Sequence, residues 1–143
     1  MDELKKHQES IILRQFRKYY PPFPKGRLIK SESPDFILKT SPKYSIGIEL
    51  TALPSSAYII TKETIQAFLA DLQQTISKKE GKLEIYRKKR ANEYWLVMFA
   101  DSIEVPGIHF NDVFSGLSGW SGFEKIFLFG LFDRQIFDIK NEK

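Results

Sequence analysis

The sequence predicts an α/β domain in which a central mixed β-sheet is flanked by helices. Segments with apolar residues at helical spacing alternate along the chain with short segments that resemble strands. One of these strand-like segments, residues 94–99, is continuously apolar, as expected for a central strand that is buried on both faces. A hairpin is predicted ahead of it, so the expected sheet combines strands of both directions.

The first half of the chain predicts a helix, three strands and a second helix. Residues 2–20 carry apolar residues at helical spacing and end at a run of prolines, which cannot continue a helix. Residues 26–30 lead into a short strand, and residues 31–53 are typical of two strands joined by a turn. After a loop at 54–56, Thr61 is placed to cap a helix with an apolar stripe over residues 65–76. Whether that helix continues through Gly81 is left open, since one interior glycine costs only about 1 kcal/mol.

The second half predicts two or three strands after the central one begins at Tyr94. Residues 101–122 are rich in Gly, Ser and Asp and are expected to be irregular, with one helical turn at 111–117. Residues 126–129 form a second apolar strand, and 136–139 a further strand after a turn at 132–135. A length of 143 residues suits one domain, so residues 1–143 are expected to form a single unit.

Composition excludes several classes of protein and site. Hydrophobic residues make up 42% of the chain and aromatic residues 14%, which is a globular composition. The absence of cysteine excludes disulfides, thiolate catalysis and cysteine-based zinc sites. No apolar run is long enough to span a membrane, and the charged start of the chain lacks a signal-peptide core. We therefore expect a soluble, cytoplasmic protein without a membrane partner.

Basic residues form two clusters, one within the first thirty residues and one at residues 78–90. The net charge of +4 favours a polyanionic partner such as nucleic acid, whose phosphates would be bound in a salt-dependent way. If the second cluster is helical, Lys82, Tyr86 and Lys89 share one face and are expected to contact a nucleic-acid backbone. The alternative is that both clusters form ordinary solvated helix surface.

Two acidic residues interrupt the predicted hairpin. Asp35 opens its first strand, and Glu49 lies near the end of its second, on the face opposite Ile48. Gly47 shares the face of Glu49 and leaves room beside it. Two carboxylates on the same side of a hairpin suit Mg²⁺, which binds one or two carboxylates and keeps other positions for water and phosphate.

The spacing of these acids resembles a known family. Pro34-Asp35, followed fourteen residues after the aspartate by Glu49-Leu50-Thr51, is similar to the motif of the PD-(D/E)XK nuclease superfamily. The resemblance implies a restriction-endonuclease-like core, which has the same order of elements. It also implies a magnesium or manganese site formed by Asp35, Glu49 and the carbonyl of Leu50.

One position departs from the family motif. The family's lysine is replaced by Thr51, whose hydroxyl carries no positive charge and is expected to hydrogen-bond to water or to the metal's ligands. A cation from another segment would then be needed beside the acids. Lys62, at the start of the second predicted helix, is the best-placed candidate, and the alternative is that it is an ordinary surface lysine at the start of a helix.

Each candidate also has an ordinary structural explanation. Asp35 follows a proline, and both residue types favour turns and strand starts. Glu49 would be stable in an apolar strand if it paired with a lysine or arginine. Glu32 is either a third acid or an exposed strand residue, and Glu9 is either near the metal or on a solvated helix surface. His109 and His7 have no partners at the spacing of a metal site or a catalytic triad.

Three functions follow from these observations. The first is a metal-dependent nuclease-like domain acting on nucleic-acid phosphodiesters. The second is a catalytically degenerate module of the same fold that binds nucleic acid or protein, which the replacement at Thr51 favours. The third is an interaction protein whose aromatic-rich carboxyl half packs against a partner, because twelve phenylalanines in so small a domain can leave an apolar patch exposed.

Overall fold

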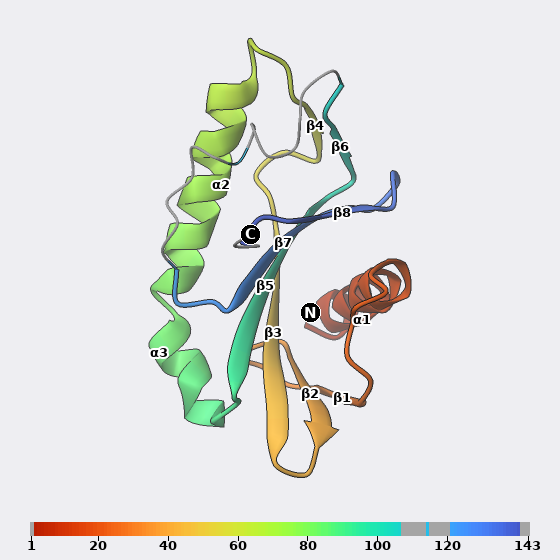
Figure 1. Ribbon diagram of the computed structural model, residues 1–143, viewed down its shortest axis with the longest axis vertical. Helices are drawn as coiled ribbons and strands as arrows, with labels where there is room; N and C mark the ends of the chain where they lie inside the picture. Colours follow the sequence, from red (N-terminus) through yellow and green to blue (C-terminus); the bar gives the residue numbers. More distant parts are fainter. Residues whose placement is uncertain (1, 107–113, 115–120, 141–143) are drawn as a thin grey trace.

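A six-stranded mixed sheet separates two helical layers in the computed structural model, which describes residues 2–106, 114 and 121–140 (Figure 1). The strands of this sheet are β1 (Arg27–Lys30), β2 (Phe36–Ser41), β3 (Tyr44–Ala52), β5 (Glu93–Ala100), β7 (Lys125–Gly130) and β8 (Gln135–Asp138). Their order is β1-β2-β3-β5-β7-β8. The three central strands β3, β5 and β7 are parallel, and the outer pairings are antiparallel. The predicted α/β class with a mixed sheet flanked by helices is confirmed.

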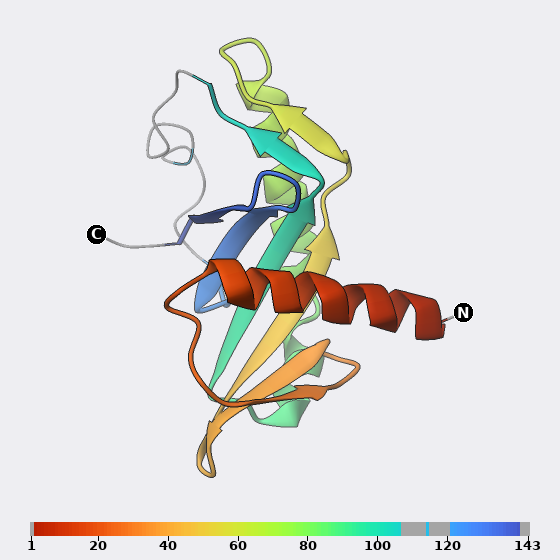
Figure 2. The same ribbon diagram turned by 90° about the vertical axis from the view of Figure 1, so that its right-hand side faces the viewer.

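One face of the sheet is covered by the first helix, α1 (Asp2–Tyr19), which crosses in front of the strands in Figure 2. Its Leu13 and Phe16 are fully buried against the sheet. The ring of Phe16 packs edge-on against Phe127 and Phe129 of β7 at centroid distances of 5.1 and 5.7 Å. Burying such side chains contributes roughly 1.5 to 3 kcal/mol each, so this aromatic cluster holds α1 to the sheet.

The opposite face is covered by α2 (Ile65–Glu80), α3 (Leu83–Tyr86) and the 3-10 turn η1 (Arg87–Lys89). These elements form the crossover that two parallel neighbours, β3 and β5, require. The predicted stripe on α2 is buried, and the helix ends just before Gly81. The N-cap of α2 is Thr64, not Thr61, because the chain first makes a turn in which the amides of residues 64 and 65 donate to the carbonyl of Thr61.

Two short strands were not expected from the sequence. β4 (Ala57–Ile59) and β6 (Ser102–Glu104) pair in parallel as a separate two-stranded sheet. The prediction that residues 101–122 are irregular is therefore wrong for β6, because a three-residue strand carries too little alternation to be recognised. Apart from Phe114, the helical turn expected at 111–117 lies outside the described residues, as does His109.

None of the helices in the described part of the chain is long and apolar enough to cross a membrane.

Candidate functional site

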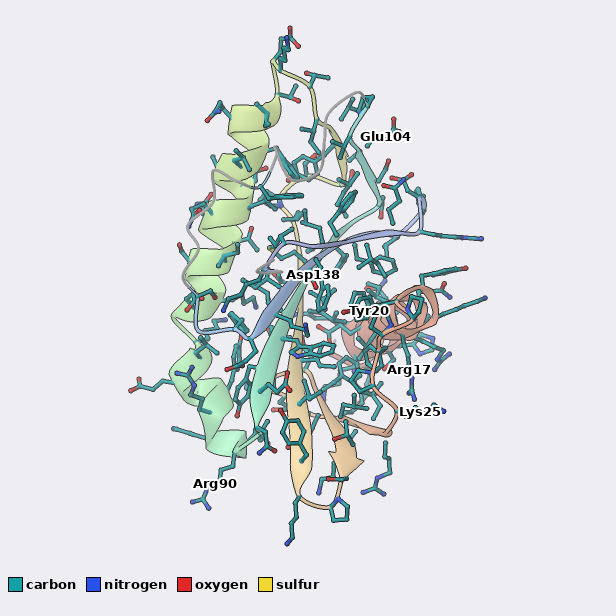
Figure 3. The ribbon with its side chains drawn as sticks, in the orientation of Figure 1. Arg17, Tyr20, Lys25, Arg90, Glu104 and Asp138 are labelled. Carbon is teal, nitrogen blue, oxygen red and sulfur yellow. The ribbon has the colours of Figure 1, made fainter. Side chains whose placement is uncertain are left out.

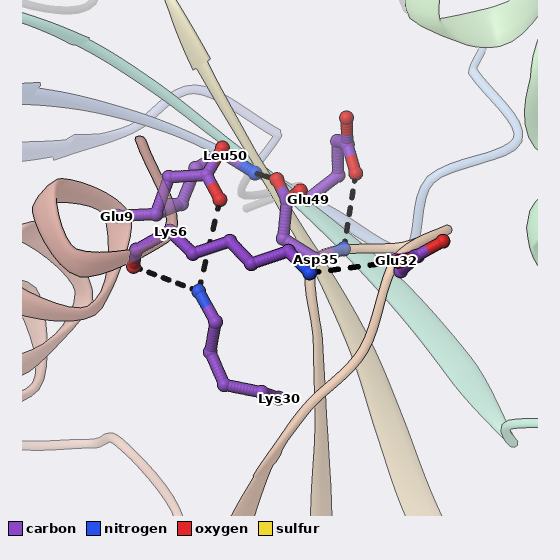
Figure 4. A network of polar contacts seen from close by, with 7 residues as sticks. All are labelled: Lys6, Glu9, Lys30, Glu32, Asp35, Glu49 and Leu50. Atoms are coloured by element: carbon purple, nitrogen blue, oxygen red, sulfur yellow. Dashed lines mark hydrogen bonds and ion pairs between the residues drawn. The ribbon is translucent and has the colours of Figure 1, made fainter. Parts of the chain in front are cut away.

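The predicted hairpin brings Asp35 and Glu49 into direct contact. The last paired residues of β2 and β3 at this end are Phe36 and Ile48, and β3 continues beyond them. There the amide of Leu50 donates to Asp35 Oδ2 at 2.9 Å, and the amide of Asp35 donates to Glu49 Oε1 at 3.2 Å (Figure 4). Carboxylate oxygens therefore accept backbone hydrogen bonds at the point where the two strands stop pairing, which fixes both acids in place.

The two carboxyl groups share a partly dehydrated environment. Glu49 is only 6% exposed, and Asp35 is half-buried. Burial, followed by the nearby negative charge of Glu49, raises the pKa of Asp35 to about 7, although the Leu50 amide and Lys79 act in the opposite direction. Two acids held this close favour either a proton or a cation between them.

Lys79, in the last turn of α2, lies directly against this pair. Its Nζ is 2.8 Å from Glu49 Oε2, and the Lys79 side chain is 14% exposed. The sequence contained a signal for it, because Lys79 follows Ile76 by three residues and Leu72 by seven, on the buried stripe of α2. A lysine that continues an apolar stripe needs a buried anionic partner, and here that partner is Glu49.

Lys62 does not lie beside the acids, which corrects the expectation that it supplies the cation. It is exposed in the turn before α2, at the end of the helix opposite to Lys79. Fourteen residues separate Ile65 from Lys79, which corresponds to about 21 Å along a helix axis. The expectation failed because the last turn of α2, and not its first, packs against the carboxyl half of β3.

Tyr86 is buried, which corrects its expected role as a nucleic-acid contact. Its side chain is 2% exposed and belongs to the core beneath α2 and α3. Among the described residues its hydroxyl has no hydrogen-bond partner, and burial, followed by the charge of nearby Glu49, raises its pKa. Lys82 and Lys89 are exposed. The three do not share a face, because α3 is a single turn followed by a 3-10 turn.

A cleft of about 670 Å³ opens at the carboxyl ends of β3 and β5. In α/β sheets ligands commonly bind at this edge of the parallel strands. Asp35, Glu49, Leu50 and Thr51 line it together with Lys79, so Thr51 does lie beside the acids. From the other side α1 contributes Lys5, Gln8 and Glu9.

The two further acids considered from the sequence have different surroundings. Glu9 lines the cleft, its negative charge helps to raise the pKa of Asp35, and Lys30 Nζ lies 3.9 Å from its carboxylate (Figure 4). Lys30 Nζ also donates to the carbonyl of Lys6 at 2.7 Å, which anchors α1 to β1. The side chain of Glu32 is 82% exposed and pairs with Lys6 at 3.5 Å, so Glu32 is not part of the site.

The oxygen atoms at this site fit a small hard cation. In the described part of the chain, one oxygen of Asp35 accepts no hydrogen bond, and Glu49 retains lone pairs because each of its oxygens accepts only one. The carbonyl of Leu50 points to the same side of β3 as its amide, as in any strand. No group of three His, Cys, Asp or Glu residues that could hold a metal occurs in the described ranges. Mg²⁺ needs only one or two carboxylates, so the pair suffices for Mg²⁺ or Mn²⁺.

Comparison with protein-family models, with curated proteins and with solved structures finds no match for this chain. Its chemistry is therefore inferred from the site itself. Two adjacent carboxylates can hold a cation, and a lysine that contacts one of them and lines the same cleft can hold an anionic oxygen. The combination suits a substrate that carries negative charge where it reacts.

Proposed function

We propose that the chain is a metal-dependent nuclease domain with a restriction-endonuclease-like core, acting on nucleic-acid phosphodiesters. The observation that carries the proposal is the meeting of Asp35, Glu49 and Lys79 in one cleft, although they come from three different parts of the chain. The order of the elements supports it. A helix precedes the acidic hairpin, and a helical crossover then leads to a buried parallel strand.

The site residues have separate roles in this reaction. Asp35 and Glu49, with the carbonyl of Leu50, would hold Mg²⁺ or Mn²⁺. The ion, when bound, would lower the pKa of a water molecule and offset negative charge on the phosphate. Lys79 would supply the positive charge that Thr51 lacks and stabilise charge that develops on the phosphoryl oxygens. Thr51 would donate a hydrogen bond within the cleft and thereby help to orient the attacking water.

Incubation with labelled DNA and RNA, with Mg²⁺ or Mn²⁺ and with a chelator, tests the proposal. We expect cleavage that requires the metal and is lost in Asp35→Asn, Glu49→Gln and Lys79→Met. Lys62→Met is a matched control, since it removes an exposed lysine from the far end of α2. Cleavage that survives both acidic substitutions would show that this cleft is not the active site.

One observation favours a second candidate, a module of the same fold that binds nucleic acid without cleaving it. Both oxygens of Glu49 already accept hydrogen bonds, from the Asp35 amide and from Lys79, so the fold neutralises Glu49 without a metal. Titration calorimetry with Mg²⁺ and Mn²⁺ separates the two functions. Absence of metal binding together with salt-dependent binding of DNA would favour the module.

A further inference from the structure

A second cleft lies next to the cleft at the acids, on the α2 side. This second cleft has a volume of about 480 Å³ and shares Thr51, Ala52 and Lys79 with the first. Its other lining residues include Gln74, Lys78 and Lys82. The two clefts therefore lie side by side at the carboxyl end of β3, between α1 and the last turns of α2, and are together called the groove below.

The two parts of this groove differ in charge. The part that contains the acids is lined by four carboxylates, those of Glu9, Asp35, Glu49 and Asp101, against two lysines, Lys5 and Lys79. The described residues that line the second part include no carboxylate but three lysines, Lys78, Lys79 and Lys82. A polyanion is thus repelled by the first part unless a metal is bound there, and is attracted by the second part without any metal.

The basic side chains of the second part come from the end of α2 and from the turn that follows it. Gln74 and Lys78 are spaced four residues apart on α2, whereas Lys82 lies beyond the end of α2, immediately before α3. Residues four apart lie on one side of a helix, about 6 Å apart along its axis. Lys78 and Lys82 are exposed, whereas the adjacent Lys79 turns inward to Glu49. Two exposed lysines therefore line the same cleft next to the part that holds the acids.

We propose that one strand of a nucleic acid lies in this groove, with successive backbone phosphates bound by Lys78 and Lys82 on one side of the reacting phosphodiester. This inference deepens the proposed function and rests on it for the position of the reacting bond. Contacts with phosphates fix the position of a strand without reading its bases, so the binding is independent of sequence. Its affinity falls as salt rises, because each phosphate contact releases counterions.

Other basic side chains lie elsewhere on the molecule and provide controls. Figure 3 shows Arg90 at the end of the α2–α3 layer, and Arg17 and Lys25 on the side of α1. Lys88 and Lys89, in the 3-10 turn, are exposed, and neither lines the groove. Replacing these two lysines changes the net charge as much as replacing Lys78 and Lys82 does. Comparison of the two double variants therefore separates the loss of a local contact from a general effect of net charge.

Fluorescence anisotropy of a labelled single-stranded oligodeoxythymidylate, bound by the full chain with a chelator present, tests the inference. We expect Lys78→Ala/Lys82→Ala to weaken binding by about tenfold or more at low salt. The slope of log affinity against log salt should fall by about 1.4, since each contact with a single strand contributes about 0.7. Lys88→Ala/Lys89→Ala should change affinity and slope much less. Equal losses in the two double variants, or no loss in the first, would overturn the inference.

The outcomes also separate this inference from the proposed function. Binding that depends on Lys78 and Lys82, without cleavage in any metal, supports the groove and removes the nuclease assignment. Metal-dependent cleavage that is lost in Glu49→Gln but unchanged in Lys78→Ala/Lys82→Ala, together with unchanged affinity in that double variant, overturns the groove and leaves the nuclease assignment intact.

Discussion

Glu49 and Glu93 are carboxylates on neighbouring parallel strands, yet their surroundings are different. Glu93, at the start of β5, accepts a hydrogen bond from the indole N–H of Trp95 at 2.8 Å and another from the hydroxyl of Tyr44. Glu49, near the end of β3, accepts one from the Asp35 amide and one from the ammonium group of Lys79. Glu93 is thus held by neutral donors on its own strand and on β3, and Glu49 in part by a cation from another layer.

A cleft alone does not distinguish the two positions. A cleft of about 340 Å³ borders Glu93, and one of about 670 Å³ borders Glu49. The difference is the second carboxylate, since the pKa of Asp35 is raised in part by the charge of Glu49. A hydrogen-bonded carboxylate beside a cavity is common in proteins, whereas two carboxylates and a partly buried lysine at one point are typical of a site for charged ligands.

Removal of Lys79 should have the largest effect on stability. Lys79→Met leaves Glu49 buried without its cation, which typically costs about 3 to 5 kcal/mol. Removing a neutral donor from Glu93, in Tyr44→Phe, should cost about 1 kcal/mol or less, because Tyr44 is 39% exposed. Urea unfolding of both variants measures the difference. Similar losses in the two variants would show that Glu49 is no more dependent on its partner than Glu93 is.

The second largest difference is expected between the cleavage rates of variants at Glu49 and at Glu93. Glu49→Gln should lower metal-dependent cleavage by at least about 100-fold, as is common when charge stabilisation of a transition state is removed. Glu93→Gln should cleave at close to the unmodified rate, because it lies at the opposite end of the parallel strands. Gel assays of labelled DNA under single-turnover conditions measure both. Equal losses in the two variants would contradict the assignment of the site to the carboxyl end of β3.

Asp35 should make the stability of the metal-free protein dependent on pH. Its pKa is raised from 3.8 to about 7 by folding, so the folded chain retains a proton that the unfolded chain releases above pH 3.8. This contribution is fully present below pH 3.8 and is lost as the pH rises through 7. Linkage gives a loss of about 1.4 kcal/mol between pH 6 and pH 8.

Subtracting the pH profile of Asp35→Asn from that of the unmodified chain isolates this contribution, because asparagine does not titrate. Urea unfolding at several pH values provides both profiles. A difference between the two profiles that stays constant from pH 6 to pH 8 would show that the Asp35 carboxyl is not influenced by Glu49 and burial as described.

The smallest difference in stability is expected between variants that remove the hydroxyl of Tyr86 and of Tyr94. The Tyr94 hydroxyl donates to the carbonyl of Tyr86 at 3.1 Å and accepts from the amide of Ala91 at 2.9 Å. Tyr94→Phe should therefore cost about 1 to 2 kcal/mol. Tyr86→Phe should be neutral or slightly stabilising, because the hydroxyl that it removes is buried without a partner among the described residues. Thermal unfolding of the two variants measures this, and a loss of stability in Tyr86→Phe would reveal a contact with Glu49.

The sequence by itself determined most elements of the six-stranded sheet and its helices, although not β4 and β6, and it determined the pairing of the two acids. The register of the hairpin shifts between Lys39 and Ser41, but from Lys39 to Phe36 it is regular and ends at the pair Phe36 and Ile48, so the next residues along the two strands are Asp35 and Glu49. The central strand was likewise evident from six consecutive apolar residues beginning at Tyr94, because only a strand covered on both faces needs such a run. Both conclusions depend on local geometry, which the chain encodes within a few residues.

Only the tertiary structure decided which cation meets the acids and what lies around them. Lys79 is thirty residues from Glu49 in the chain, and their contact depends on which end of α2 packs against β3. The periodicity of the helix fixed its buried face but not its position along the sheet, so Lys62 and Lys79 were both compatible with the sequence. The burial of Tyr86 was decided in the same way, because it depends on which side of the short helix α3 packs against the core. Contacts between layers arise from the packing of whole elements, and no short segment of sequence determines them.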